Sequence, residues 1–295
     1  MSKNLPNAKF LDNTNFDFAN SMVIKPPFED TKTYNPESEI KYTRVVIDSR
    51  DRNLVLYPTP DRYVIDLETD IPEVTSAQVI IKEVPVKSIY LIHKYNNTFQ
   101  VQVELGPWVT ISIGVGNYDN VSALLQAVSL ALASSSYLTA YQFVVTVNNA
   151  FNFSASREGL QVDWTIAFGN NTSDLPQILG FLPVATPIQS LYGNIQAPFT
   201  FNCLPNRYVV LNVDQLTVNN SVNPVLHKST ALISAYEWRN TTDHPVQKTL
   251  NPPIARLSKL VISFTDYYGN PVDFQNQDHR LEFLFKSRKH LSRYV

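Results

Sequence analysis

The side chains most able to ligate a metal or act as nucleophiles are few and widely separated. The candidates are one cysteine, Cys203, and five histidines, His93, His227, His244, His279 and His290. No two of these histidines lie at the short spacing of paired ligands, and one cysteine cannot build a structural zinc site. A single cysteine also excludes a disulfide within the chain. We therefore expect no metal site and no cofactor.

The best local pairing of a carboxylate with an imidazole is Asp278-His279, with Asp273 close by. Such a pair could serve general acid–base catalysis, but no Gly-x-Ser-x-Gly nucleophile motif accompanies it. The stretch Gly114-Val115-Gly116 lacks the Gly-Lys-Ser/Thr of a phosphate-binding loop. A glycosidase would need two carboxylates about 5–10 Å apart, and no spacing selects such a pair. The sequence favours a turn at Asp278-His279, and we expect a protein that is not an enzyme.

One helix is predicted in a chain dominated by strand patterns. Residues 110–113 alternate polar and apolar side chains, and Gly114, Gly116 and Asn117 end that strand. Apolar residues then recur at helical spacing, at Val121, Leu124, Leu125, Val128 and Leu132. Asp119 or Asn120 can accept hydrogen bonds from the first free amides. These features predict a helix over about 119–133, inserted between two strands.

The other periodic segments alternate with a period of two. The predicted strands are residues 42–48, 62–67, 77–84, 88–93, 99–105, 110–113, 143–147, 160–168, 208–213, 216–218, 230–236, 256–265 and 281–285. We expect a turn at 148–154, a short helical turn at 175–182 and a long polar loop at 240–253. Helices after most strands, which a parallel α/β fold needs, are missing. The pattern predicts an all-β fold, a single jelly-roll β-sandwich of ~8 core strands with loop insertions.

The composition favours a subunit of an assembly. Charged residues make up 17 % of the 295 residues, aromatic residues 12 %, and the net charge is −2. So few charges leave much neutral surface, and the near-zero balance argues against a general nucleic-acid binder. No apolar run has the length of a signal peptide or of a membrane span of ~18 residues. We expect a protein made in a reducing cytosol.

Both ends of the chain differ from its middle. Residues 1–40 are rich in Asn, Pro and Thr, and they carry aromatic residues spaced like anchors on an extended arm: Phe10, Phe16, Phe18 and Phe28. The arm either is a disordered tail or becomes ordered on a neighbouring subunit. Residues 41–285 show no linker and are predicted to form one domain. Residues 286–295 form a basic tail.

Two groups of charged residues are candidates for subunit contacts. Arg50 and Arg52 lie in a dense cluster, Ser49-Arg50-Asp51-Arg52, which is either a solvated turn or a contact with a partner. The basic tail carries four cations and no acid, namely Lys286, Arg288, Lys289 and Arg293. It is either a solvated terminus or a segment that docks on an anionic neighbour, such as an acidic subunit, an inner membrane or nucleic acid.

The order of several motifs resembles the minor capsid and penton proteins of large icosahedral double-stranded DNA viruses, the nucleocytoplasmic large DNA viruses. The motifs are Ile47–Arg52 followed by Tyr57–Tyr63, Gly116–Tyr118, Leu179–Phe181 and Asp266–Leu281. The resemblance covers about residues 42–285. It implies a jelly-roll component of a viral shell with no catalytic residues, assembled in the host cytoplasm.

The resemblance leaves more than one role open. A penton would form the five-fold vertex as a pentamer, in contact with the major capsid protein and other minor capsid proteins and without a specific nucleic acid. The alternatives are a non-vertex minor capsid protein that cements capsomers, and a jelly-roll module that binds a receptor or glycan. For the glycan-binding alternative, Trp108 and Trp238 are the candidates to stack on sugars.

Overall fold

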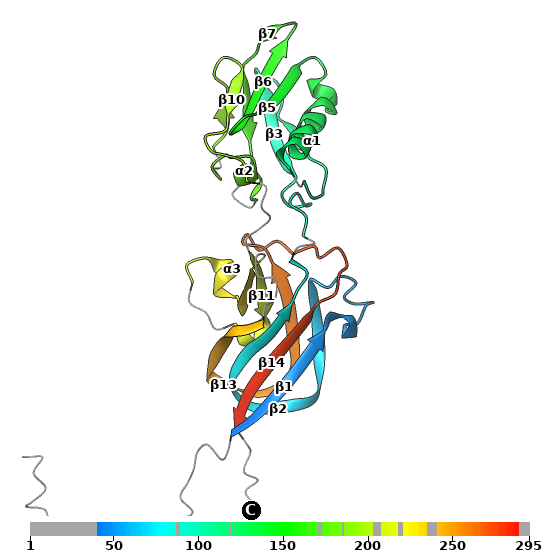
Figure 1. The fold of residues 1–295 in the computed structure, drawn as a ribbon, viewed down its shortest axis with the longest axis vertical. Coiled ribbons are helices and arrows are strands. Elements are labelled where there is room, and N and C mark those ends of the chain that lie inside the picture. The colour runs from blue at the N-terminus through cyan, green and yellow to red at the C-terminus, as the bar shows by residue number, and fades with distance from the viewer. Residues whose placement is uncertain are drawn as a thin grey trace, which may run out of the picture. The chain divides into compact units, whose positions relative to one another are not determined.

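The computed structural model describes residues 40–86, 89–118, 120–169, 173–184, 186–202, 208–217, 221–234 and 241–288, without the side chains of 81–82 and 241–245 (Figure 1). Several predictions lie outside the described residues. They concern the arm with Phe10, Phe16, Phe18 and Phe28, the tail residues Lys289 and Arg293, and also Asp119, Cys203, Trp238 and His290. The side chain of His244 is likewise outside them.

β-Strand prevails over helix among the described residues, in antiparallel sheets, which confirms the predicted all-β class. In chain order the elements are β1 (Ile40–Asp48), β2 (Arg62–Glu83), β3 (Thr98–Val103), β4 (Val109–Ser112), α1 (Val121–Ala133), β5 (Gln142–Val147), β6 (Phe151–Arg157), β7 (Leu160–Gln161), β8 (Trp164–Ala167), α2 (Leu175–Ile178), β9 (Ile188–Gln189), β10 (Asn194–Gln196), β11 (Tyr208–Val213), α3 (Pro224–His227), β12 (Ala231–Ser234), β13 (Thr241–Thr265) and β14 (Arg280–Arg288).

Six strands form one antiparallel sheet in the order β1-β14-β2-β13-β11-β12, which we call the curled sheet. Its two long strands, β2 and β13, each consist of two halves that have different neighbours in the sheet. Residues 62–72 of β2 pair with 256–263 of β13, whereas residues 74–83 pair with β14 on one side and with the start of β13 on the other. Near the boundary of the halves, the register with β13 shifts between Thr249 and Ile254, and Glu73 has a positive φ of 42°.

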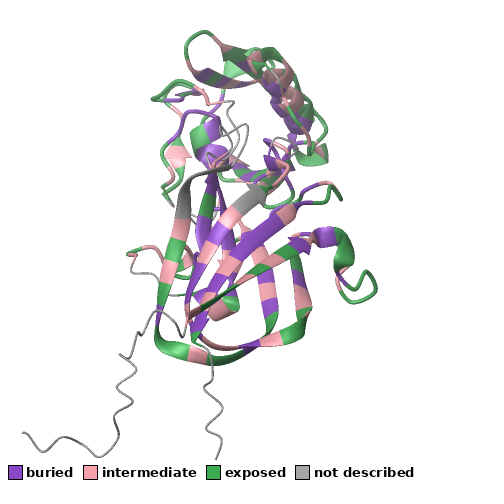
Figure 2. Cartoon of the chain, turned by 60° about the horizontal axis from the view of Figure 1, so that its bottom comes forward, coloured by how far each residue is buried: buried purple, intermediate pink, exposed green. Residues whose placement is uncertain are grey.

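These halves divide the curled sheet into two groups of four strands. One group contains β1, β14, the second half of β2 and the first half of β13. The other contains the first half of β2, the second half of β13, β11 and β12. Their inward side chains form one hydrophobic core, with Tyr63, Phe264, Phe283 and Phe285 fully buried. Figure 2 shows buried and exposed residues alternating along the long strands, as a sheet with one covered face requires.

Between β2 and β11 the chain builds a second core, and we call residues 91–202 the inserted lobe. It contains two further antiparallel sheets, β4-β3-β8-β9 and β10-β6-β5, with β7 paired to β6. The predicted helix is confirmed as α1, capped by the Asn120 side chain, which accepts a hydrogen bond from the Ala123 amide at 2.9 Å. Leu124 and Val128 on α1 are fully buried in this core with Phe151 and Trp164.

Several predicted segments were wrong, most clearly the polar loop at 240–253, because residues 241–253 of it lie in the first half of β13. This half pairs only with β2 among the described strands, so it is an edge that tolerates polar residues and prolines. The turn at 148–154 is largely strand β6, and Leu216, the first residue of the predicted strand 216–218, belongs to a 3-10 turn, Asp214–Leu216. No strand is assigned among the described residues of 88–93, and 160–168 is split into β7 and β8.

Candidate functional site

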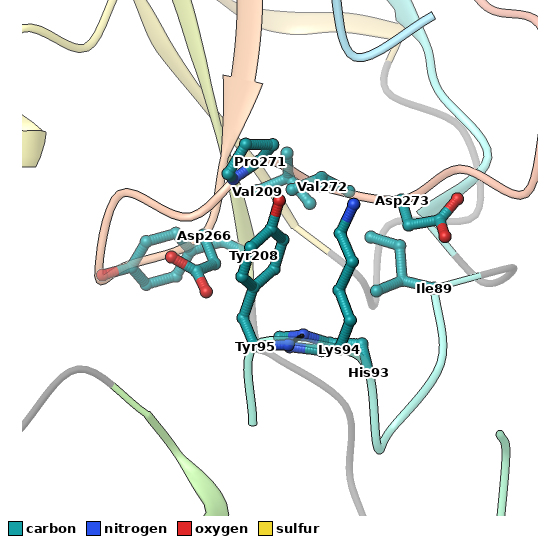
Figure 3. Close-up of a pocket in the computed structure, with 10 residues that line it drawn as sticks. All are labelled: Ile89, His93, Lys94, Tyr95, Tyr208, Val209, Asp266, Pro271, Val272 and Asp273. Atoms are coloured by element: carbon teal, nitrogen blue, oxygen red, sulfur yellow. Dashed lines mark hydrogen bonds between the residues drawn. The ribbon is translucent and has the colours of Figure 1, made fainter. Parts of the chain in front are cut away.

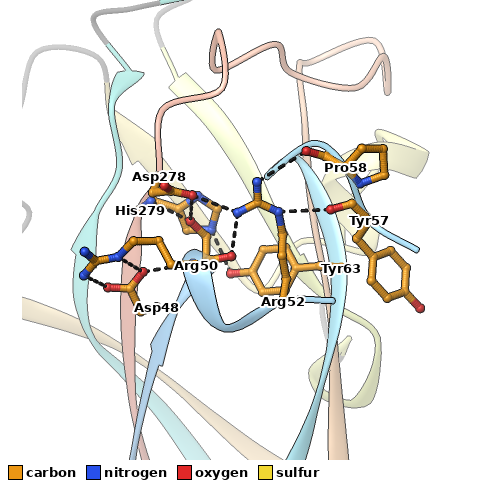
Figure 4. A network of polar contacts seen from close by, with 9 residues as sticks. Asp48, Arg50, Arg52, Tyr57, Pro58, Tyr63, Asp278 and His279 are labelled. Carbon is orange, nitrogen blue, oxygen red and sulfur yellow. Dashed lines mark hydrogen bonds and ion pairs between the residues drawn. The ribbon is translucent and has the colours of Figure 1, made fainter. Parts of the chain in front are cut away.

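A polar network holds the turn that follows β1, and it begins at the predicted Ser49-Arg50-Asp51-Arg52 cluster (Figure 4). Ser49–Asp51 form a 3-10 turn, and the Asp48 side chain accepts from the Arg50 amide at 3.0 Å. Arg50 also donates Nε and one terminal nitrogen to that carboxylate, at 2.9 and 2.6 Å. Hydrogen bonds from Arg50 lower the pKa of Asp48 to about 2. The Arg50 side chain is otherwise exposed, so its predicted role in a subunit contact stays a prediction.

Arg52 occupies a different position, because its guanidinium is buried and bonded within the chain. It donates to the carbonyls of Ser49 at 2.6 Å and Tyr57 at 3.1 Å, and more weakly to that of Pro58 at 3.4 Å. It also pairs with Asp278 Oδ1 at 2.8 Å. These bonds join the turn after β1 to the segment before β14 and use the donors that a partner would need.

Asp278 and His279 complete the network, but their side chains are not bonded to each other in it. The Ser49 hydroxyl donates to Asp278 Oδ1 at 2.7 Å and accepts from the His279 amide at 3.0 Å. Hydrogen bonds from Ser49 and Arg52 lower the pKa of Asp278. The His279 ring instead lies 2.8 Å, Nε2 to hydroxyl oxygen, from Tyr63.

The surroundings of His279 favour a neutral imidazole. Its ring packs against Phe264 and Phe274, and burial lowers its pKa to about 4. Burial also raises the pKa of Tyr63, so the hydroxyl beside Nε2 stays protonated. The contacts of the His279 ring with two core rings and with the Tyr63 hydroxyl stabilise this part of the curled sheet.

An exposed apolar loop follows this network in the sequence, and it was not predicted from the sequence. Leu54, Val55 and Leu56 have exposed fractions of 59 %, 91 % and 68 %. The Asn53 carboxamide accepts from the amides of Val55 and Leu56 at 3.0 and 3.2 Å, and the Tyr57 amide bonds the Asn53 carbonyl at 2.8 Å. With Arg52 holding the carbonyls of Tyr57 and Pro58, both ends of the loop are fixed. We call Leu54–Leu56 the apolar loop.

Two further predicted contact residues, Lys286 and Arg288, lie beside the start of β1, at the opposite end of that strand from Arg50. Lys286 and Arg288 belong to β14 rather than to a tail, and they pair with Tyr42 and Ile40 at the start of β1. Arg50 follows the end of β1, so at ~3.4 Å per residue these positions are about 25 Å or more apart. Among the contact residues that the structure describes, Lys286 and Arg288 therefore lie far from Arg50 and Arg52.

Pockets and metal-ligand groups add little to this site. The hollow lined by His93, Lys94, Tyr95 and Asp266 has a volume of about 10 Å³, room for one water-sized sphere (Figure 3). Within the described ranges no group of three or more His, Cys, Asp or Glu side chains could hold a metal ion. No helix in the described part of the chain combines the length and the apolar character needed to cross a membrane.

A family model described as "Family of unknown function (DUF5901)" matches residues 30–230. The chain belongs to this family. The match begins before β1 and ends beyond α3, so it covers the whole inserted lobe and the first strands of the curled sheet. No curated protein matches the chain. The family's description names no activity, ligand or partner.

Proposed function

We propose that this DUF5901 chain is a structural subunit of an icosahedral viral shell and that its curled sheet is a jelly roll. A jelly roll has eight strands in two four-stranded sheets. Counting the halves of β2 and β13 separately gives eight strands in the two groups of four described above. With this count, the inserted lobe occupies the connection between the third and fourth strands.

The apolar loop is the observation that carries the assembly role. Three consecutive exposed apolar residues oppose solubility unless a partner covers them. The loop is also held by the Arg52 network, so little conformational entropy is lost when a partner binds it. A heterologous contact, in which this loop enters a different surface of the next copy, builds a ring when the rotation between copies closes. Such a ring at a five-fold vertex is the penton role that the motif resemblance implies.

Exposed apolar residues on β1 fit the same role. Tyr42 and Val46 lie on the outer face of β1, where they are more than half exposed. Glu282 lies opposite Val46 on this face, but it is fully buried and paired with Arg44 and with Arg280, at 3.6 Å from the latter. This face therefore presents the apolar side chains of Tyr42 and Val46, and the negative charge of Glu282 is neutralised by its arginine partners. A cementing minor capsid protein would use the same surfaces on other subunits.

The proposal is tested by replacing the most exposed residue of the apolar loop. A Val55→Asp variant should shift the purified protein from oligomer to monomer in sedimentation velocity, because a charge cannot be buried unpaired in the contact. Val222→Asp is the matched control, since Val222 is also fully exposed but lies outside the loop. An oligomer that V55D and V222D leave equally intact would contradict the role of the loop.

A further inference from the structure

A groove without charged side chains lies on the inserted lobe and has a volume of about 530 Å³. It is lined by residues 107–112, from the turn before β4 and from β4 itself, and by Ala131 and residues 134–137 after α1. None of these residues is Lys, Arg, His, Asp or Glu. The volume lies within the ~300–1,000 Å³ of sites for small organic ligands.

Two aromatic side chains give this groove its character. Trp108 is 41 % exposed and Tyr137 is 70 % exposed, whereas Trp164 of the same lobe is buried in the core. The indole N–H of Trp108 and the hydroxyl of Tyr137 make no hydrogen bond to any other residue that the structure describes. Each ring therefore offers an apolar face and an unused polar group.

Both rings are mounted on well-fixed backbone. Before Trp108, the Gly106 amide bonds the Val103 carbonyl at 3.0 Å, and the Gln102 carboxamide donates to the Gly106 carbonyl at 2.8 Å. Next to Tyr137, Leu138 is buried, and its amide bonds the Ser135 carbonyl at 3.0 Å. Little ordering is thus required when a ligand binds.

Hydroxyl groups complete the lining. Thr110, Ser112 and Ser136 are exposed, and their hydroxyls make no hydrogen bond within the described part of the chain. A hydroxyl both donates and accepts, so it suits a partner that does the same. Because its lining has no cationic and no acidic side chain, the groove lacks the groups that favour a phosphate or a cation.

These features fit the chemistry of a sugar. One face of a pyranose ring presents C–H groups that pack on an aromatic face, and its rim presents hydroxyls that exchange hydrogen bonds. We propose that the groove between Trp108 and Tyr137 binds a neutral oligosaccharide, with a pyranose ring stacked on the indole. This inference does not depend on the role in a shell.

The test uses the full chain and short soluble oligosaccharides of glucose, galactose, mannose and N-acetylglucosamine, in calorimetric titration and ligand-observed NMR. At least one probe should bind, and Trp108→Ala and Tyr137→Ala should each weaken that binding at least about tenfold. Tyr192→Ala is the matched control. Tyr192 is a 78 % exposed tyrosine of the same lobe, in a separate groove lined by Glu104 and Asp163.

Several results would overturn the proposal. One is the absence of binding by every neutral probe at millimolar concentration, and another is binding that W108A and Y137A leave unchanged. Loss of binding in Y192A alone would place the sugar in the other groove. Trp108→Phe keeps a ring face but lacks the indole N–H, so an intermediate affinity is expected and serves if W108A fails to fold. Binding of extended peptides alone, along the open edge of β4, would also contradict it.

Discussion

In the curled sheet Ile40 lies opposite Arg288, whereas in the inserted lobe Val147 lies opposite Phe151, four residues further along. All strand pairings of the lobe stay within residues 98–196. The curled sheet can close only after the whole chain is made, so its closure carries a larger entropic cost. The hydrogen bonds of Ser49 and Arg52 to Asp278 join the two ends of the curled sheet, which are far apart in sequence. The lobe is instead stabilised by hairpins and an aromatic core.

The two separate cores predict that the two regions lose structure separately. Phe283→Ala in the curled sheet and Phe153→Ala in the lobe should each cost about 4 kcal/mol of local stability, because both side chains are fully buried. Hydrogen exchange read by mass spectrometry should show faster exchange in residues 98–196 for F153A. For F283A the faster exchange should appear in β1, β2 and β14. Uniform acceleration across the chain in both variants would show a single cooperative unit.

The second largest loss of stability is expected when the hydrogen bonds of Arg52 are removed from the curled sheet. Arg52→Ala removes four hydrogen bonds of a buried guanidinium and should lower the free energy of unfolding by about 3 kcal/mol in urea. Arg50→Ala is the matched control, because its pair with Asp48 is exposed and is expected to contribute under ~1 kcal/mol. Equal losses in the two variants would contradict the role given to Arg52.

A smaller effect is expected from pH, because protonation of His279 lowers the stability of the curled sheet. The pKa of His279 is about 4 in the folded chain and about 6.5 when unfolded, so the unfolded state binds a proton first as the pH falls. Stability from this group is complete above about pH 6.5 and is lost towards pH 4, with about 2 kcal/mol lost between pH 7 and pH 5.

His279→Gln, which can still bond the Tyr63 hydroxyl, should flatten that part of the pH profile. Some slope should remain, because burial also lowers the pKa of His93. Urea unfolding at a series of pH values measures both profiles. A wild-type slope in H279Q would show that His279 is not the group that titrates.

Local features of the sequence were sufficient for part of the fold. The helix α1 and the short strands β3, β4 and β5 follow from periodicity and from caps within a few residues. The first half of β13 was missed because its polar residues and Pro252-Pro253 suggest a loop. Its strand character comes from β2, more than 150 positions earlier. Likewise β2 was predicted as two strands, because Pro72 and Glu73 interrupt the alternation.

The candidate site likewise depends on contacts between residues that are far apart in the sequence. The charge cluster at Ser49–Arg52 was visible, but the main partner of Arg52 is Asp278, 226 positions away. Burial of Arg52, and with it the fixed shape of the apolar loop, therefore could not follow from local spacing. The run Leu54-Val55-Leu56 was visible as composition, yet only its exposure distinguishes it from a core strand.

We propose that this DUF5901 chain assembles with itself through the apolar loop. Light scattering on the purified chain across a range of concentrations tests it most directly. We expect a mass of five chains, either at all concentrations or appearing as the concentration rises, and a single-chain mass for V55D. A wild-type chain that stays monomeric at every concentration would contradict self-assembly and leave the apolar loop to a different protein.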